Sequence, residues 1–91
     1  PPAVIDLERL EAWGRQLLLD ADAGNAGAVA GDVAIMETIR DRFVHTLDPA
    51  AADRLTTALA ELRGQADAKN LSGVENAVPS LLAALDALRS G

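Results

Sequence analysis

The single histidine of this 91-residue chain follows two carboxylates at helical spacing. Glu37, Asp41 and His45 are each four residues apart, so on a helix they would form one stripe. Imidazole nitrogen and carboxylate oxygen are ligands for divalent metals. Three successive turns spread the groups over about 12 Å, however, so further ligands would have to come from elsewhere. The favoured interpretation is a solvated polar face with weak surface ion pairs, and a metal site is the alternative.

A second set of residues could contact another helix. Trp13 is the single tryptophan; it would be the best anchor for a partner if exposed, but at helical spacing it is more often core. Met36 has the same two interpretations. Gly27 and Gly31, together with nearby alanines, form a small-residue face that would let a neighbouring helix approach closely. We expect this face to pack within the domain, with a dimer seam as the alternative.

Carboxylates gather near two predicted turns, at Asp20, Asp22 and Asp32 and at Asp67. Their spacing is sparser than in a calcium-binding loop. With one His, no Cys and no Tyr, the chain offers few groups for acid–base or nucleophilic catalysis. A phosphorylated His45 would fit a phosphotransfer domain, but the flanking residues include no neighbouring Lys-Gly. We expect neither enzyme activity nor a cofactor.

Composition limits the class of protein and its partners. The net charge of −6 disfavours nucleic acid, which is bound through clustered Lys and Arg, and it disfavours an anionic membrane surface. No apolar run approaches the roughly 20 residues of a membrane span. The absence of cysteine excludes disulfides and thiolate metal sites. Hydrophobic residues make up 49% of the chain, mainly helix-forming Ala and Leu. Such a core is modest and leaves room for a dimer.

The beginning of the chain bears on its origin. Pro1 and Pro2 stand where an initiator methionine would be expected, which indicates a processed protein or a piece of a longer one. Processing would place the chain in the periplasm or outside the cell, and the sequence favours neither that nor the cytoplasm. Abundant alanine and a preference for arginine over lysine indicate a GC-rich bacterial genome.

These residues must be positioned by helices. Apolar residues follow the three-then-four spacing of a helix with one buried face in four segments, at about 6–21, 26–46, 49–66 and 71–89. Asp48 before Pro49 is the clearest boundary, an N-cap followed by proline at the first helical position. Pro79 lies inside the last segment, where proline removes a hydrogen bond. We expect a kink or a break there.

Other N-caps are predicted from residue type. Asp6 would cap the first segment, with a hydrophobic staple between Ile5 and Leu10, and Asn25 would cap the second. The last segment has two candidate caps, Asn70 and Ser72.

The two halves of the chain are similar to each other. When residues 9–41 are aligned with 54–86, ten of 33 positions match without a gap, against about three expected by chance. The pattern Ala-Asp-Ala-x-Asn-x-x-x-Val occurs at 21–29 and again at 66–74. This 45-residue repeat indicates a duplicated helical hairpin whose copies cover each other's apolar faces.

The predicted fold is therefore an all-α, antiparallel four-helix bundle. It forms one domain over residues 1–91, with hairpins at 6–47 and 48–90; a helical solenoid is the alternative. We expect a non-catalytic module that binds a protein partner or a second copy, with Trp13, Gly27, Gly31 and Met36 at the interface. The alternative is an extracytoplasmic protein that binds a metal or small ligand through Glu37, Asp41 and His45, with Met36 as a further ligand.

Overall fold

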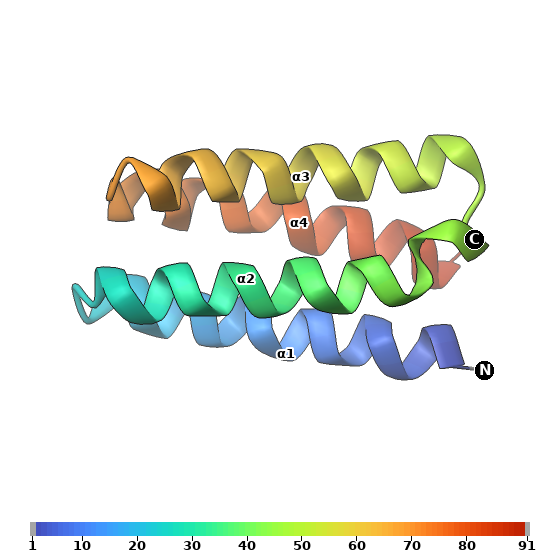
Figure 1. Cartoon of the computed structure of the whole chain (residues 1–91), viewed down its shortest axis with the longest axis horizontal. Coiled ribbons are helices and arrows are strands. Elements are labelled where there is room, and N and C mark those ends of the chain that lie inside the picture. Colours follow the sequence, from blue (N-terminus) through green and yellow to red (C-terminus); the bar gives the residue numbers. More distant parts are fainter. Residues whose placement is uncertain (1, 91) are drawn as a thin grey trace.

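The chain folds as an antiparallel four-helix bundle. The computed structural model describes the backbone of residues 2–90 and the side chains of residues 4–90. The helices are α1 (Pro2–Asp22), α2 (Ala26–Phe43), α3 (Pro49–Asp67) and α4 (Leu71–Ser90), with a 3-10 turn, η1 (Val44–Thr46), after α2. α1 and α3 each pack against both α2 and α4. Consecutive helices run in opposite directions (Figure 1). The predicted fold is confirmed.

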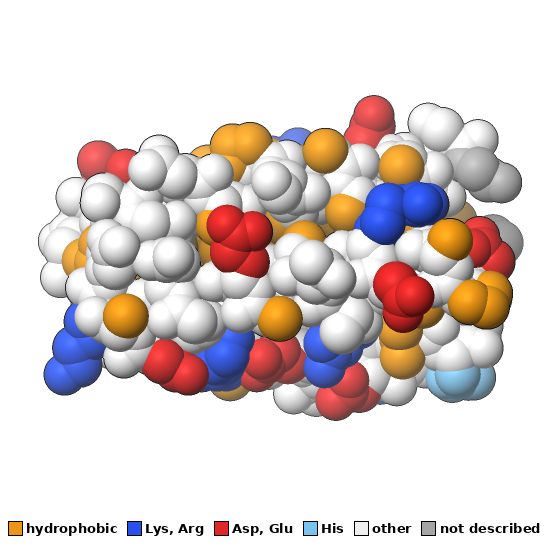
Figure 2. Space-filling view, turned by 90° about the horizontal axis from the view of Figure 1, so that it is seen from above, with side chains coloured by type: hydrophobic (Ala, Val, Ile, Leu, Met, Phe, Trp, Pro, Cys, Tyr) orange, Lys and Arg blue, Asp and Glu red, His pale blue; other side chains and the backbone are white. Residues whose placement is uncertain are grey.

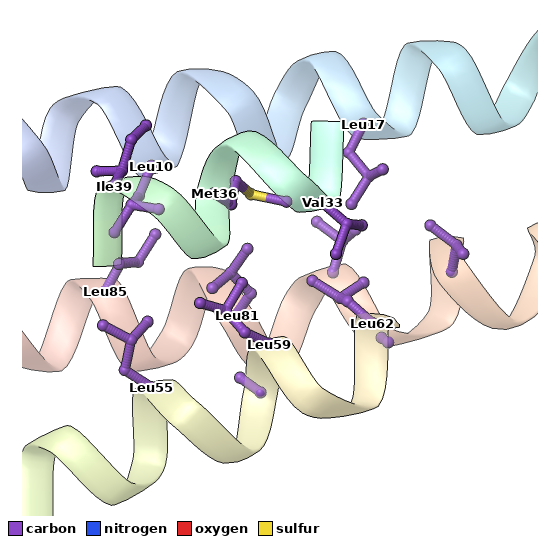
Figure 3. Packing of buried hydrophobic residues seen from close by; sticks show 14 of the residues in the cluster. Leu10, Leu17, Val33, Met36, Ile39, Leu55, Leu59, Leu62, Leu81 and Leu85 are labelled. Atoms are coloured by element: carbon purple, nitrogen blue, oxygen red, sulfur yellow. The ribbon is translucent and has the colours of Figure 1, made fainter. Parts of the chain in front are cut away.

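All four helices contribute leucines, valines or other large apolar side chains to one core (Figure 3). The largest fully buried side chains are Leu10, Leu17, Val29, Val33, Met36, Leu55, Leu59, Leu62, Val74, Val78, Leu81 and Leu85. These are the positions that helical spacing predicts. On α2, helical spacing fits either Ile35 or Ile39 as a core position, and the structure buries Ile39 and leaves Ile35 38% exposed.

Two predicted boundaries are wrong. α1 begins at Pro2, so Asp6 lies inside the helix and cannot cap it; proline suits the first helical position because its missing N–H needs no partner there. Ile5 is 55% exposed, which rules out the predicted staple to Leu10. α2 ends at Phe43, and the residues predicted to extend it form η1 instead.

Three caps are confirmed. The side chains of Asn25 and Asp48 accept hydrogen bonds of 3.0 Å from the N–H groups of Ala28 and Ala51. For α4, the cap is Asn70, which accepts from the N–H of Gly73 at 3.0 Å. Ser72 supports this cap, because its hydroxyl donates to Asn70 Oδ1.

The α1–α2 and α3–α4 turns have the same backbone path. In both, three successive N–H groups donate to carbonyls at equivalent positions: Ala23, Gly24 and Asn25 to Leu19, Ala21 and Asp20, and Ala68, Lys69 and Asn70 to Gly64, Ala66 and Gln65. Gly24 and Lys69, 45 residues apart, both have positive φ, 74° and 56°. The turns are thus structurally equivalent, and the duplication that would explain them stays a prediction.

α4 continues through Pro79 without interruption, so the predicted break is wrong. Pro79 cannot donate a hydrogen bond to the carbonyl of Glu75. The predicted kink stays a prediction.

Two ion pairs connect the two hairpins, and a glycine lies where α1 packs against α4. Arg63 on α3 binds Glu37 on α2 through Nε and Nη2, at 3.1 and 2.5 Å, and Arg89 on α4 binds Glu11 on α1 at 2.5 Å. At Gly14 on α1, a Cβ atom would lie only 3.4 Å from Leu82 Cδ2. Two leucines of α4 therefore lie against α1 where α1 has no side chain.

The small-residue face of α2 is open to solvent, contrary to the expectation that it packs within the domain. Gly27, Gly31 and Ala34 are exposed. A Cβ atom at Gly31 would have no atom of another helix within 4 Å. A glycine that does face another helix is Gly14 on α1, which lies against leucines of α4.

This openness gives a stability prediction. Gly31→Ala should raise the free energy of unfolding by about 1 kcal/mol, because alanine has the higher helix propensity and nothing blocks its methyl group. Gly64→Ala, at an exposed position on α3 that is equally open, is the matched control and should give a gain of similar sign. Urea unfolding measures both. A loss at Gly31 alone would show that this face is covered in solution.

Candidate functional site

A groove runs between α1 and α2 on the outside of the bundle. We call it the α1/α2 groove. It has a volume of about 450 Å³ and is lined by Arg9, Trp13, Ala34, Ile35, Thr38, Ile39 and Arg42. Trp13 is half-buried and packs against the core. One part of its side chain therefore belongs to the core, and the rest is available to a partner. Its remaining surface and that of Ile35 form an apolar floor that water can reach.

Both charged residues of the lining lie toward one end of the groove. Arg9 precedes Trp13 by one turn of α1, and Arg42 is near the end of α2. Since the helices are antiparallel, these positions lie at the same end. Arg42 Nη2 is 3.7 Å from Asp6 Oδ1, a loose pair. Arg9 has no ion pair with any carboxylate of the described residues.

An equivalent groove lies between α3 and α4, on the side of the molecule that Figure 2 faces. It has a volume of about 570 Å³ and is lined by Asp53, Arg54, Thr57, Ala58, Glu61, Ser80, Ala83, Ala84 and Ala87. Six of the α1/α2 lining positions recur there after a shift of 45 residues. Arg9 corresponds to Arg54, whereas the positions equivalent to Trp13, Ile35 and Arg42 hold alanine or serine. The two grooves therefore share a location and differ in chemistry.

The proposed metal ligands are not brought together. Glu37 binds Arg63, Asp41 binds its neighbour Arg40 at 2.9 Å, and His45 is exposed in η1 rather than on α2. The hydrogen bonds that Arg63 donates to Glu37 raise the pKa of Arg63. Within residues 2–90, no three His, Asp or Glu side chains form a cluster that could hold a metal ion.

The predicted interface residues differ in whether the structure leaves them exposed. Met36 is fully buried, so it can serve neither as an interface residue nor as a ligand in this structure. Gly27 and Gly31 are exposed on α2, and of the four predicted residues only Trp13 lines the groove.

A carboxyl pair between α1 and α2 was only partly foreseen. Asp32 is 6% exposed, and its Oδ2 is buried without a hydrogen-bond donor among the described residues. Burial, first, and the neighbouring carboxyl group of Asp20, second, raise the pKa of Asp32 to about 7. Gln16 donates to Asp20 Oδ1 at 3.1 Å. Burial and a neighbouring negative charge both disfavour the ionised carboxylate, so the neutral, protonated form of Asp32 persists to a higher pH than in an exposed aspartate.

The sequence did contain a signal for this pair. Asp32 lies between Val29, Val33 and Met36 on the apolar side of its helix, and the equivalent position in the second half is Ala77. The prediction placed Asp32 beside a turn, in a loosely spaced acidic group, and overlooked that its helical position points into the bundle.

No helix in the part of the chain that the structure describes is both long and apolar enough to cross a membrane. No family model, curated protein or solved structure is significantly similar to this chain, so its function has to be inferred from its own geometry.

Proposed function

We propose that this protein is a non-catalytic interaction module that binds another protein through the α1/α2 groove. The observation that carries the proposal is the apolar floor of Trp13 and Ile35, part of which stays in contact with water. Tryptophan is the residue most typical of binding hot spots. Two antiparallel helices with a groove between them suit a third helix, which would lay its apolar face into it.

The comparison between the two grooves supports this choice of surface. The α3/α4 groove is the larger, but its apolar lining consists of alanines, which offer little area to a partner. The large apolar side chains and the second arginine occur only in the α1/α2 groove. A binding role explains why one of two equivalent grooves carries these residues.

Site-specific photo-crosslinking tests the proposal. A benzophenone amino acid at position 35 should give adducts in cells that make the protein naturally, whereas the same group at position 80, the equivalent place in the other groove, should give few. Thr38→Tyr should reduce the adducts at 35, because an uncharged bulky side chain would fill the groove. Thr38 is exposed on α2, so the variant should fold. Equal yields at both positions, or none at 35, would contradict the proposal.

A further inference from the structure

We propose that the segment bound in the α1/α2 groove is an acidic amphipathic helix of another protein. Its carboxylates would pair with Arg9 and Arg42, and its apolar side chains would cover Trp13 and Ile35. This inference rests on the proposed function and adds the chemistry of the partner.

The charge of the groove is the first argument. The chain carries a net charge of −6, yet the lining of the α1/α2 groove contains two arginines and no acid. The α3/α4 lining has the opposite balance, with Arg54 beside Asp53 and Glu61. A basic partner would be attracted to most of this protein's surface, but at the α1/α2 groove it would meet two positive charges.

The availability of these arginines is the second argument. Arg40, Arg63 and Arg89 are each paired with a carboxylate at 2.9 Å or less, whereas the pairs of Arg15 and Arg42 are both 3.7 Å long. Arg9 makes no such pair with the described residues, and the single pair of Arg42 is long, with 52% of its side chain exposed. Guanidinium groups bind carboxylates through paired hydrogen bonds. Both groups can therefore accept a partner's carboxylate without breaking a close internal contact.

The spacing along the groove is the third argument. Arg9 and Trp13 are four residues apart on α1, so charge and apolar floor follow each other within about one helical turn, roughly 6 Å. An amphipathic helix presents a carboxylate one turn away from an apolar side chain at i and i+3 or i+4. Such a segment would match both features of the groove at once.

Two synthetic peptides provide the probe. Both are amphipathic 18-residue helices with the same leucine stripe and no tryptophan, and their polar positions are glutamate in one and lysine in the other. Trp13 is the only tryptophan of the protein and lines the groove, so its fluorescence reports binding there directly. The glutamate peptide should shift Trp13 emission to shorter wavelength in a saturable manner that weakens with added salt. The lysine peptide should leave the emission unchanged.

Charge reversal gives the matched control. Replacing both groove arginines, Arg9→Glu with Arg42→Glu, should weaken the glutamate peptide about tenfold or more, because two attractions become repulsions. Arg54→Glu makes the same change at the equivalent position of the other groove and should leave the affinity within about twofold. Circular dichroism establishes that the variants keep their helices.

Three results would overturn this inference. A shift of Trp13 emission by the lysine peptide equal to that by the glutamate peptide would show that the groove does not select acids. An equal loss with Arg54→Glu would show a general charge effect. A shift that depends on protein concentration without peptide would identify a second copy as the occupant. If crosslinking at position 35 persists while both peptides fail, the partner chemistry is wrong and the proposed function stands.

Discussion

Asp32→Asn is expected to stabilise the protein at pH 8 by on the order of 4 kcal/mol, because asparagine mimics the protonated form that burial favours. Burial, first, and Asp20, second, raise the pKa of Asp32 from 3.8 to about 7. A shift of one pKa unit corresponds to 1.36 kcal/mol. Because the folded pKa is the higher one, the folded state holds the proton more tightly than the unfolded state does. The stabilisation from the protonated form is complete below pH 4 and is lost as the pH rises to about 7.

The difference in free energy of unfolding between variant and wild type reports the protonation of Asp32, because groups that titrate alike in both proteins cancel. The free energy of unfolding of both proteins, measured by urea titration between pH 4 and pH 8, should diverge steadily from pH 4 to 7 and then stay parallel. Asp32→Ala should show a similar gain at pH 8, since alanine already occupies the equivalent buried position 77 at 4% exposure. An Asn variant that is less stable than wild type at pH 8 would contradict the raised pKa of Asp32.

The contact between α1 and α4 provides the second large effect. Leu81→Ala should cost about 2–5 kcal/mol, because Leu81 is fully buried and its removal leaves a cavity. Gly14→Leu should cost about 1–3 kcal/mol through overpacking, since a Cβ atom at Gly14 would already lie 3.4 and 3.6 Å from the Cδ2 atoms of Leu82 and Leu81. One change removes side-chain volume between α1 and α4, and the other adds volume in the same place.

Combining them should therefore recover stability. In the double variant the new leucine at position 14 can occupy part of the cavity left at 81, so the total cost should be smaller than the sum of the single costs by roughly 0.5–3 kcal/mol. A double-mutant cycle in urea measures this coupling. Leu55→Ala, a fully buried leucine on α3, combined with Gly14→Leu is the control and should be additive. Additivity at 14 and 81 would mean that the two sites do not share space.

Helix existence and core positions could be predicted because both depend on local spacing. Asp48 and Asn25 cap as predicted, and Asn70 is the one of two candidates that caps α4, since an N-cap needs only a side chain and the N–H three residues later. The start of α1 was missed because Asp6 has the right chemistry for a cap but Pro2 begins the helix earlier.

The candidate site was harder to predict because a groove depends on how two helices are rotated about their axes. Spacing alone left both Ile35 and Ile39 open as core positions, and the groove forms where Ile39 is buried and Ile35 is not. The polar stripe failed for a related reason. Glu37 and Asp41 share a face of α2, but Arg63 lies on α3 beside only the first of them, and this contact is set by helix packing that no local pattern encodes.

The bundle has two distinct poles. α1 begins and α4 ends at one of them, and the two hairpin turns that contain Asn25 and Asn70 lie at the other, along a body 35 Å in length (Figure 1). Any carrier fused to either terminus would hold the domain by the same pole. The turn pole would then project outward, and the long sides that bear both grooves would remain uncovered by the attachment.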